Sequence, residues 1–359
     1  MPTRPPKDAI ERITMICRVI IKPSDHVFDV QPDETVLQAA LRQGHPLPYG
    51  CRDGACGSCR GKILEGRVDY GRYQPTALPE ADREAGFALF CQARPLSDLV
   101  IESREVGAVR DIPIKTLPCR VQKMERLAPD VMALYLRLPA NERLQFLAGQ
   151  YIEILTRDGK RRAFSMANAP HDDETLQLHL RHYTGGTFTE YVFTRMKERE
   201  ILRFEGPFGT FFLREDCDNP IIFLASGTGF APIKGILEHA FHRGVERPMV
   251  LYWGARTRPD LYLDALPRQW AAAHPNFRYV PVLSEPRAED EWTARTGFVH
   301  RAVMADYPDL SAHHVYACGA PVMVEAAHRD FTTHCSLPED AFFSDAFTTS
   351  GDALRNAAG

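Results

Sequence analysis

Four cysteines constrain this chain more than any other feature. Cys51, Cys56 and Cys59 stand in the segment GCRDGACGSC with a C-x4-C-x2-C spacing, and Cys91 follows in ALFCQARP. Four soft thiolates at this spacing are the ligand set of a [2Fe–2S] cluster. A zinc site is the alternative, but such sites usually pair two C-x2-C hairpins, and this run contains one. We therefore predict an iron–sulfur cluster on these four residues.

The composition is that of a folded protein and offers no reason to expect a nucleic acid. The 359 residues are 44% hydrophobic and 25% charged, and the net charge is −4. The longest apolar stretches, 220–225 and 248–253, are far shorter than the roughly 20 residues of a membrane helix. Residues 1–14 lack the apolar core of a signal peptide. We expect a cytoplasmic protein without a membrane partner, whose nine cysteines are metal ligands or thiols instead of disulfides.

The hydrophobic pattern changes twice along the chain and predicts three domains. The first block has alternating strands and a short helix, capped by Asp33 and ending at Gly44. The second has short alternating runs, which favour an antiparallel barrel. In the third, strands alternate with helices, which indicates a parallel sheet. The predicted boundaries are 1–14 for an N-terminal extension, 15–107 for the first domain, 108–118 for a linker, 119–213 for the second domain and 214–359 for the third.

A basic, an aromatic and a hydroxyl residue follow one another in KRRAFSMAN of the second block. Strand alternation places Arg162 and Phe164 on one face and Ser165 on the other. This arrangement suits an aromatic cofactor that carries a phosphate, since Arg162 can pair with the anion and Ser165 can donate to a ring nitrogen.

A glycine turn before a helical pattern predicts a second phosphate contact in the same block. Gly185 and Gly186 precede the run TFTEYVF. Free N–H groups at a helix start bind anions. The backbone of Thr187, Phe188 and Thr189 is the expected site.

The third block opens with strand, glycine turn and helix in PIIFLASGTGFAPIKG. Gly227 and Gly229 let the backbone approach a pyrophosphate, and Pro232 fits the first helical turn. Pro232 also occupies the third glycine position of the dinucleotide fingerprint, so the motif departs from that pattern.

Two later strand ends complete the predicted nucleotide site. The strand VLYWGART ends at Gly254 with Arg256 beyond it, where a ribose-contacting group is expected. Another strand ends at Cys318 and Gly319, on the ligand side of such a sheet. Cys318 is thus expected to be functional, whereas Cys17, Cys119, Cys217 and Cys335 are expected to fill space in the core.

In this order, the cysteine loop, the RAFS segment and the GTG turn resemble the ferredoxin–NAD(P)H reductase superfamily with an N-terminal plant-type ferredoxin domain. The chain resembles the reductase components of bacterial oxygenases. Through RLQFLAGQYIEI and VYACGAPVMVEAA it also resembles the group called CDP-6-deoxy-glucoseen reductase. The resemblance implies a β-grasp [2Fe–2S] ferredoxin domain of the α+β class, an antiparallel β-barrel that binds FAD, and an α/β Rossmann-like NAD(P)H domain with a parallel sheet.

The resemblance also implies roles for single residues. Phe164 replaces the tyrosine of the family's flavin motif, so a hydroxyl contact is lost and the packing is kept. Cys318 matches the cysteine that flanks the nicotinamide, which makes Ser165 and Cys318 the implied catalytic residues. The other implied contacts are Leu180 and Arg181 on a second flavin strand, Gly186, Thr187, Phe188 and Thr189 at the FAD pyrophosphate, Gly227, Thr228 and Gly229 at the pyridine nucleotide, and Phe347 as an aromatic cover of the flavin.

The implied function is an electron-transfer oxidoreductase that passes electrons from NAD(P)H through FAD and the [2Fe–2S] cluster to an acceptor protein. An oxygenase or hydroxylase component is the first expected acceptor, and a CDP-sugar dehydrase is the second. A redox-sensing subunit without turnover is the rival of another class. The resemblance favours NADH, whereas Arg256 leaves NADPH open, because it can pair with a 2′-phosphate.

Overall fold

The computed structural model describes residues 16–348. The predicted extension at 1–14 and the end of the chain beyond Thr348 lie outside these residues. The described chain divides into two compact units, with the boundary between Asp111 and Ile112. Across residues 16–348 no helix is both long and apolar enough to span a membrane.

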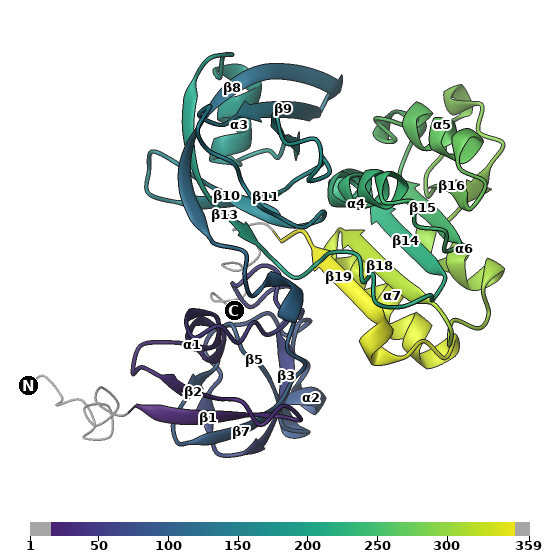
Figure 1. The fold of residues 1–359 in the computed structure, drawn as a ribbon. Helices are drawn as coiled ribbons and strands as arrows, with labels where there is room; N and C mark the ends of the chain where they lie inside the picture. Colours follow the sequence, from purple (N-terminus) through teal and green to yellow (C-terminus); the bar gives the residue numbers. More distant parts are fainter. Residues whose placement is uncertain (1–15, 349–359) are drawn as a thin grey trace, which may run out of the picture. The chain divides into compact units, whose positions relative to one another are not determined.

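The first unit is a mixed five-stranded sheet with the helix α1 packed on it (Figure 1, purple and blue). Its strand order is β2-β1-β7-β3-β5, and β1 pairs with β7 in parallel while the other neighbours are antiparallel. Together these elements form the predicted β-grasp fold. The element bounds are β1 Cys17–Lys22, β2 Val27–Val30, α1 Val36–Arg42, β3 Arg60–Glu65, β4 Val68–Asp69, α2 Glu80–Glu84, β5 Phe87–Leu89, β6 Arg94–Pro95, β7 Leu99–Glu102 and the 3-10 turn η3 Gly107–Val109.

Helix α1 begins two residues later than the sequence prediction of an Asp33 cap. Thr35 is the N-cap: its Oγ1 accepts a bond from the Gln38 N–H (3.3 Å), and the Gln38 side chain accepts one from the Thr35 N–H (2.9 Å). This reciprocal pair satisfies two N–H groups at once, which Asp33 is too far upstream to do. The predicted stop at Gly44 holds, since this glycine has φ +78° just after the helix.

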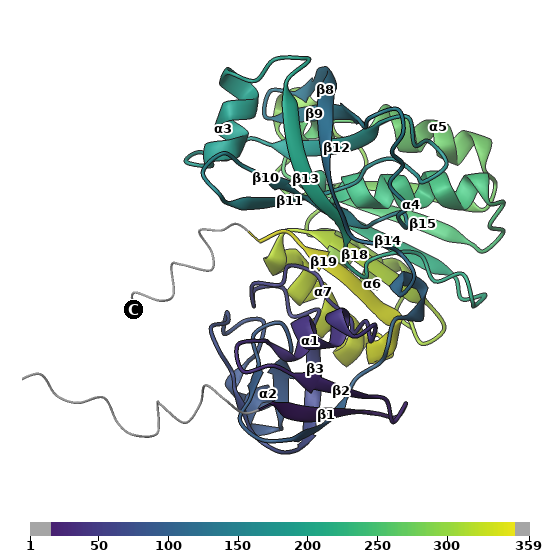
Figure 2. The same cartoon turned by 60° about the vertical axis from the view of Figure 1, so that its left-hand side comes forward.

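The second unit begins with a six-stranded antiparallel barrel (Figure 2). Its strand order is β11-β10-β13-β8-β9-β12, and a bridge between Met166 and Leu178 closes it. Apolar side chains such as Ile152, Leu178 and Phe204 fill its interior. The element bounds are β8 Lys115–Ala128, β9 Val131–Arg137, β10 Tyr151–Leu155, β11 Arg161–Ser165, β12 Leu176–Arg181, α3 Thr187–Thr194 and β13 Ile201–Phe208.

A six-stranded parallel sheet completes the second unit (Figure 1, green and yellow). Its order is β17-β16-β15-β14-β18-β19, with α4 and α5 packed together on one face and α6 and α7 packed together on the other. The sequence prediction did not include α6 or β19. The element bounds are β14 Ile221–Ser226, η4 Gly227–Gly229, α4 Phe230–His242, β15 Met249–Ala255, η5 Arg258–Asp260, α5 Ala265–Ala273, β16 Phe277–Leu283, η6 Ala288–Asp290, β17 Arg295–Thr296, α6 Val299–Asp306, β18 His314–Gly319, α7 Pro321–His334, η7 Glu339–Ala341 and β19 Phe342–Ala346.

A buried polar network joins the barrel to the parallel sheet within this unit. The Lys234 ammonium on α4 donates to the Ala167 carbonyl (3.0 Å) and the Gln177 side-chain oxygen (3.2 Å). On β12, His179 Nδ1 lies 2.9 Å from the Tyr262 hydroxyl. We call Lys234, Gln177, His179 and Tyr262 the junction network. Buried polar groups must be paired, so these bonds fix how the two halves meet.

Candidate functional site

The four cysteines of the sequence motif lie together in the first unit. The Cys51 N–H donates to Cys56 Sγ (3.3 Å), and the side chain of Gln92 donates to Cys91 Sγ (3.8 Å). A hydrogen bond with Cys51 lowers the pKa of Cys56 to about 6, and one with Cys59 lowers the pKa of Cys91. None of the nine cysteines forms a disulfide. The loop and Cys91 therefore bring four sulfurs to one place.

The backbone of the cysteine loop is shaped to hold a compact group. Gly54 has φ +81°, and a Cβ there would lie 2.6 Å from the Arg72 carbonyl oxygen. At Gly50 a Cβ would lie 3.2 Å from Cys56 Sγ, so a side chain would crowd the donors. Soft sulfur donors in a tight, glycine-shaped cradle fit an iron–sulfur cluster.

On β11 the predicted flavin residues alternate as expected. Arg162 and Phe164 are half-buried, whereas Ser165 is buried. The Phe164 ring packs against Phe188 at the start of α3, with 5.6 Å between ring centres. The strand and the helix start thus belong to one surface of the barrel.

Polar groups near this surface fit a phosphate. The Nε and Nη2 atoms of Arg181, at the end of β12, are buried without a hydrogen-bond partner among the described residues, and Nε lies 3.4 Å from Asp130 Oδ2 in an ion pair. The guanidinium lies beside Gly227, whose Cβ would be 3.7 Å from Arg181 Cζ. Helix α3 begins at Thr187 after Gly186 without a side-chain cap, so its first N–H groups face outward. A phosphate satisfies such donors.

The GTG turn is held tightly against the end of β18. A Cβ on Gly229 would lie 2.7 Å from Gly319 Cα and closer still to the Cys318 carbonyl. Gly319 has φ +134°, and a Cβ there would lie 2.5 Å from the Ser226 carbonyl oxygen. The turn residue Thr228 is buried. The GTG turn and the Cys318 strand end therefore form one surface.

The barrel and the parallel sheet converge at Ser165. Its hydroxyl donates to Asp345 Oδ2 (3.3 Å), and Asp345 is the register partner of Cys318 across β18 and β19. All three side chains are buried. The sequence prediction missed Asp345. The sequence signal that could have indicated it is the position of this acidic residue, two places before the aromatic Phe347.

The remaining predicted site residues lie in different environments. Leu180 is buried in the barrel interior, and Pro232 is buried in the first turn of α4. Arg256 is exposed beyond β15. The Phe347 N–H donates to the Gly319 carbonyl (2.8 Å), which places its backbone beside the turn.

Helix packing alone explains why residue 254 is a glycine. A Cβ on this residue would lie 2.7 Å from Val299 Cβ on α6. Glycine here lets α6 approach β15, whether or not a nucleotide contacts it.

Three family models match consecutive parts of the chain. A 2Fe-2S iron-sulfur cluster binding domain matches residues 19–96, an oxidoreductase FAD-binding domain matches 118–213, and an oxidoreductase NAD-binding domain matches 223–329. The CDP-6-deoxy-L-threo-D-glycero-4-hexulose-3-dehydrase reductase of Yersinia pestis is 41% identical over 94% of this chain and 100% of that protein. The chain belongs to the ferredoxin–NAD(P)H reductase superfamily.

Other relatives of this reductase serve oxygenases. It is 35% identical to the phenol 2-monooxygenase reductase component DmpP of Pseudomonas sp. strain CF600, over 96% of this chain and 99% of that one. Its structure is similar to the Amycolatopsis cytochrome P450 reductase GcoB, with a TM-score of 0.73, 33% identity and coverage of 93% and 99% of the two chains. The predicted fold class and the [2Fe–2S], FAD and NAD(P)H cofactor set are confirmed. The reductase is an electron-transfer oxidoreductase.

Proposed function

We propose that this reductase takes electrons from NAD(P)H and delivers them one at a time to an acceptor protein, by way of FAD and the [2Fe–2S] cluster. The observation that carries the proposal is the convergence of Ser165, Asp345 and Cys318 where the flavin strand meets the nucleotide turn. FAD accepts a hydride as an electron pair, and the cluster carries single electrons. A reductase with both groups converts one kind of transfer into the other.

Separate sets of residues are proposed to bind the cluster, FAD and the nucleotide. Cys51, Cys56, Cys59 and Cys91 ligate the cluster. On the barrel, Arg162, Phe164, Ser165, Leu180, Arg181, Gly186, Thr187, Phe188, Thr189 and Phe347 contact FAD. On the parallel sheet, Gly227, Thr228, Gly229, Pro232, Gly254, Arg256, Cys318 and Gly319 contact the nucleotide.

The side chains at the convergence control charge and orientation. Burial, reinforced by the nearby Asp345, raises the pKa of the Cys318 thiol well above its usual value, so this group stays neutral. Asp345 holds the Ser165 hydroxyl in one orientation through their hydrogen bond. The Arg181 guanidinium, whose Nη2 has no hydrogen-bond partner among the described residues, binds and orients a phosphate. Together they position a hydride donor and exclude water from it.

The proposed acceptor is an oxygenase or hydroxylase component. Similarity to reductase components of phenol 2-monooxygenase and terephthalate 1,2-dioxygenase supports this acceptor. A CDP-sugar dehydrase is the second candidate, supported by the 41% identity to the Yersinia pestis reductase over its whole length. Capture of the acceptor on the tagged full-length protein, followed by its reduction with NADH, distinguishes the two candidates.

The predicted domain boundaries and the cytoplasmic location belong to the same proposal. The family matches at 19–96, 118–213 and 223–329 support three domains, and strand β8 already starts at Lys115 within the proposed linker. The lack of a disulfide among the described cysteines supports a reducing compartment.

Removal of one cluster ligand tests the order of transfer. Cys56→Ser should abolish NADH-driven cytochrome c reduction and leave flavin-dependent dye reduction intact. Cys17→Ser, a buried cysteine of the same unit outside the loop, is the matched control. If dye reduction collapses equally in folded Cys56→Ser protein, the proposed order is wrong.

Turnover by the isolated protein separates a reductase from a redox sensor. Steady NADH oxidation with an artificial acceptor is expected from the reductase. A single stoichiometric oxidation, without turnover, would support the sensor instead.

A further inference from the structure

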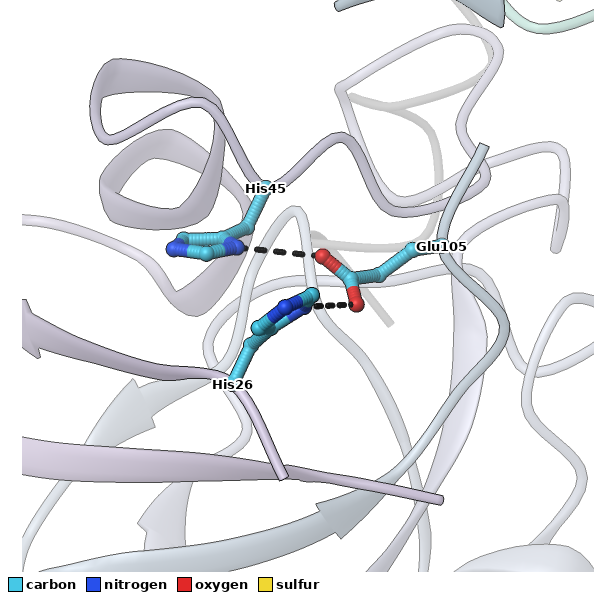
Figure 3. A group of neighbouring side chains, drawn as sticks. All are labelled: His26, His45 and Glu105. Atoms are coloured by element: carbon cyan, nitrogen blue, oxygen red, sulfur yellow. Dashed lines mark hydrogen bonds and ion pairs between the residues drawn. The ribbon is translucent and has the colours of Figure 1, made fainter. Parts of the chain in front are cut away.

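Two histidines and a glutamate meet in the first unit, and none of them belongs to the cysteine motif. His26 lies in the turn between β1 and β2, His45 follows α1, and Glu105 follows β7. Figure 3 shows the two imidazole rings facing the Glu105 carboxylate. His26 Nδ1 lies 2.6 Å from Oε2 and His45 Nδ1 lies 3.0 Å from Oε1.

The backbone on either side of each residue is anchored. The His26 carbonyl accepts a bond from the Ile21 N–H (2.9 Å), and the His45 N–H donates to the Ala40 carbonyl (2.9 Å). Beside them, the Val106 N–H donates to the Pro46 carbonyl (2.7 Å) and so ties the Glu105 segment to the His45 segment. Such anchoring pre-organises a ligand set before anything binds to it.

The side chains are supported as well. The buried Phe28 ring stacks on His45, with 6.1 Å between ring centres. The Glu105 side chain is 11% exposed and that of His45 is 19% exposed, whereas that of His26 is 49% exposed. The group therefore has a fixed inner side and an open outer side, through which an ion can enter.

The spacing of the donor atoms suits one small cation. One ligand atom from each residue lies within 4.8 Å of the others. A tetrahedral ion with bonds of about 2.0–2.1 Å to nitrogen and oxygen needs its donors roughly 3.3 Å apart. The two nitrogen–oxygen distances would have to open by well under 1 Å on this reckoning, and the two nitrogens would have to come to about the same separation from within the 4.8 Å limit.

The donor types select the class of ion. Imidazole with one carboxylate suits zinc and its neighbours, whereas magnesium and calcium prefer oxygen ligands. The Arg110 guanidinium is 3.9 Å from Glu105 Oε1, within ion-pair distance but beyond that of a hydrogen bond, so an entering cation displaces only this loose ion pair.

We propose that His26, His45 and Glu105 form a binding site for a zinc-class divalent ion, separate from the four cysteines of the loop. Three protein ligands leave a fourth position for water. The bound ion links the β1–β2 turn, the end of α1 and the segment that leaves the sheet after β7. Without the ion, the same three residues are held together by their hydrogen bonds alone.

The test uses the full-length protein with its cofactors, freed of loosely held metal and equilibrated with zinc chloride. Bound zinc per chain is measured by mass spectrometry, with iron as the internal count of the cluster. The variants are His26→Gln, His45→Gln and Glu105→Gln. His328→Gln is the matched control, because His328 also pairs with a glutamate, Glu339 (2.8 Å), but lies in the other unit and outside the proposed site. Visible circular dichroism of the cluster verifies that each variant is folded.

The wild type and the His328 control are expected to bind one zinc ion, and each site variant is expected to bind it at least tenfold more weakly. Zinc-edge X-ray absorption should then show nitrogen and oxygen neighbours at about 2.0–2.1 Å. Sulfur neighbours at about 2.3 Å would place the zinc on the cysteines and overturn the proposal. Equal zinc binding by the wild type and the folded His26→Gln variant, whose altered side chain is half-exposed, would overturn it as well.

Discussion

The junction network predicts that acid destabilises the second unit through one buried histidine. His179 is 5% exposed, and its Nε2 lies 3.0 Å from the amide nitrogen of Gln177. The Gln177 oxygen is taken by Lys234, so its amide donates and the imidazole is neutral. Burial, aided by the charge of Lys234, lowers the pKa of His179 to about 3.

The sign of the effect follows from which state holds the proton. An unfolded histidine binds a proton near pH 6.5, whereas the folded chain leaves His179 neutral down to about pH 3. The unfolded state therefore gains protons in this window, and stability falls as the pH falls. Each pH unit costs about 1.4 kcal/mol, so the step from pH 7 to pH 5 costs about 2 kcal/mol.

Tryptophan fluorescence can follow this unit alone, because Trp253, Trp270 and Trp292 all lie in it and the chain has three tryptophans. Urea unfolding at pH 7 and pH 5 gives the free energy of unfolding at each pH. The loss between them should be about 2 kcal/mol smaller in His179→Gln than in the wild type. His328→Gln serves as a control in the same unit.

The absolute stability of His179→Gln is not the test, because the substitution also changes packing. If the wild type and His179→Gln lose the same free energy between pH 7 and pH 5, His179 does not carry the effect. The reasoning from its burial would then be refuted.

Three further predictions concern the same unit. Lys234→Met should lower the free energy of unfolding by about 3–5 kcal/mol, since it leaves the Glu238 carboxylate without its ion-pair partner and two buried oxygens unpaired; an unchanged urea midpoint would contradict this. Asp345→Asn should slow NADH-driven dye reduction about tenfold by weakening the bond from Ser165, with little effect on the NADH KM; a rise in KM alone would point to nucleotide binding instead. Gly229→Ala should raise the NADH KM at least about tenfold, as the turn must move away from Cys318, while cluster circular dichroism is unchanged; an unaltered KM would show that the turn can yield.

Local sequence chemistry predicted the fold and the cofactor set well. Metal ligands need fixed residue types at fixed spacing, so GCRDGACGSC indicated its cluster without a structure. Period-two and βαβ patterns likewise predicted the barrel and the parallel sheet. Even so, Thr35 replaced Asp33 as the helix cap, because Ser, Thr, Asp and Asn compete for this role and only geometry chooses among them.

Contacts between distant residues could not be predicted in this way. Asp345 lies 180 residues from Ser165, and their hydrogen bond exists only because β19 joins the edge of the sheet. The role of Gly254 depends on Val299, in a helix that the sequence pattern did not reveal. The predicted FAD and nucleotide contacts stay predictions residue by residue.

The interlocked glycines limit how this reductase can be re-engineered. Gly229 and Gly319 each occupy space that the other segment's backbone needs, so a side chain at either would push apart both walls of the nucleotide turn. A substitution at one of these glycines cannot be offset by a substitution at the other. The turn is therefore a poor target for changing coenzyme preference. Arg256, exposed just beyond the end of β15, is the residue proposed to face the 2′ position of the nucleotide, so its exchange is the change expected to alter the preference between NADH and NADPH without touching either glycine.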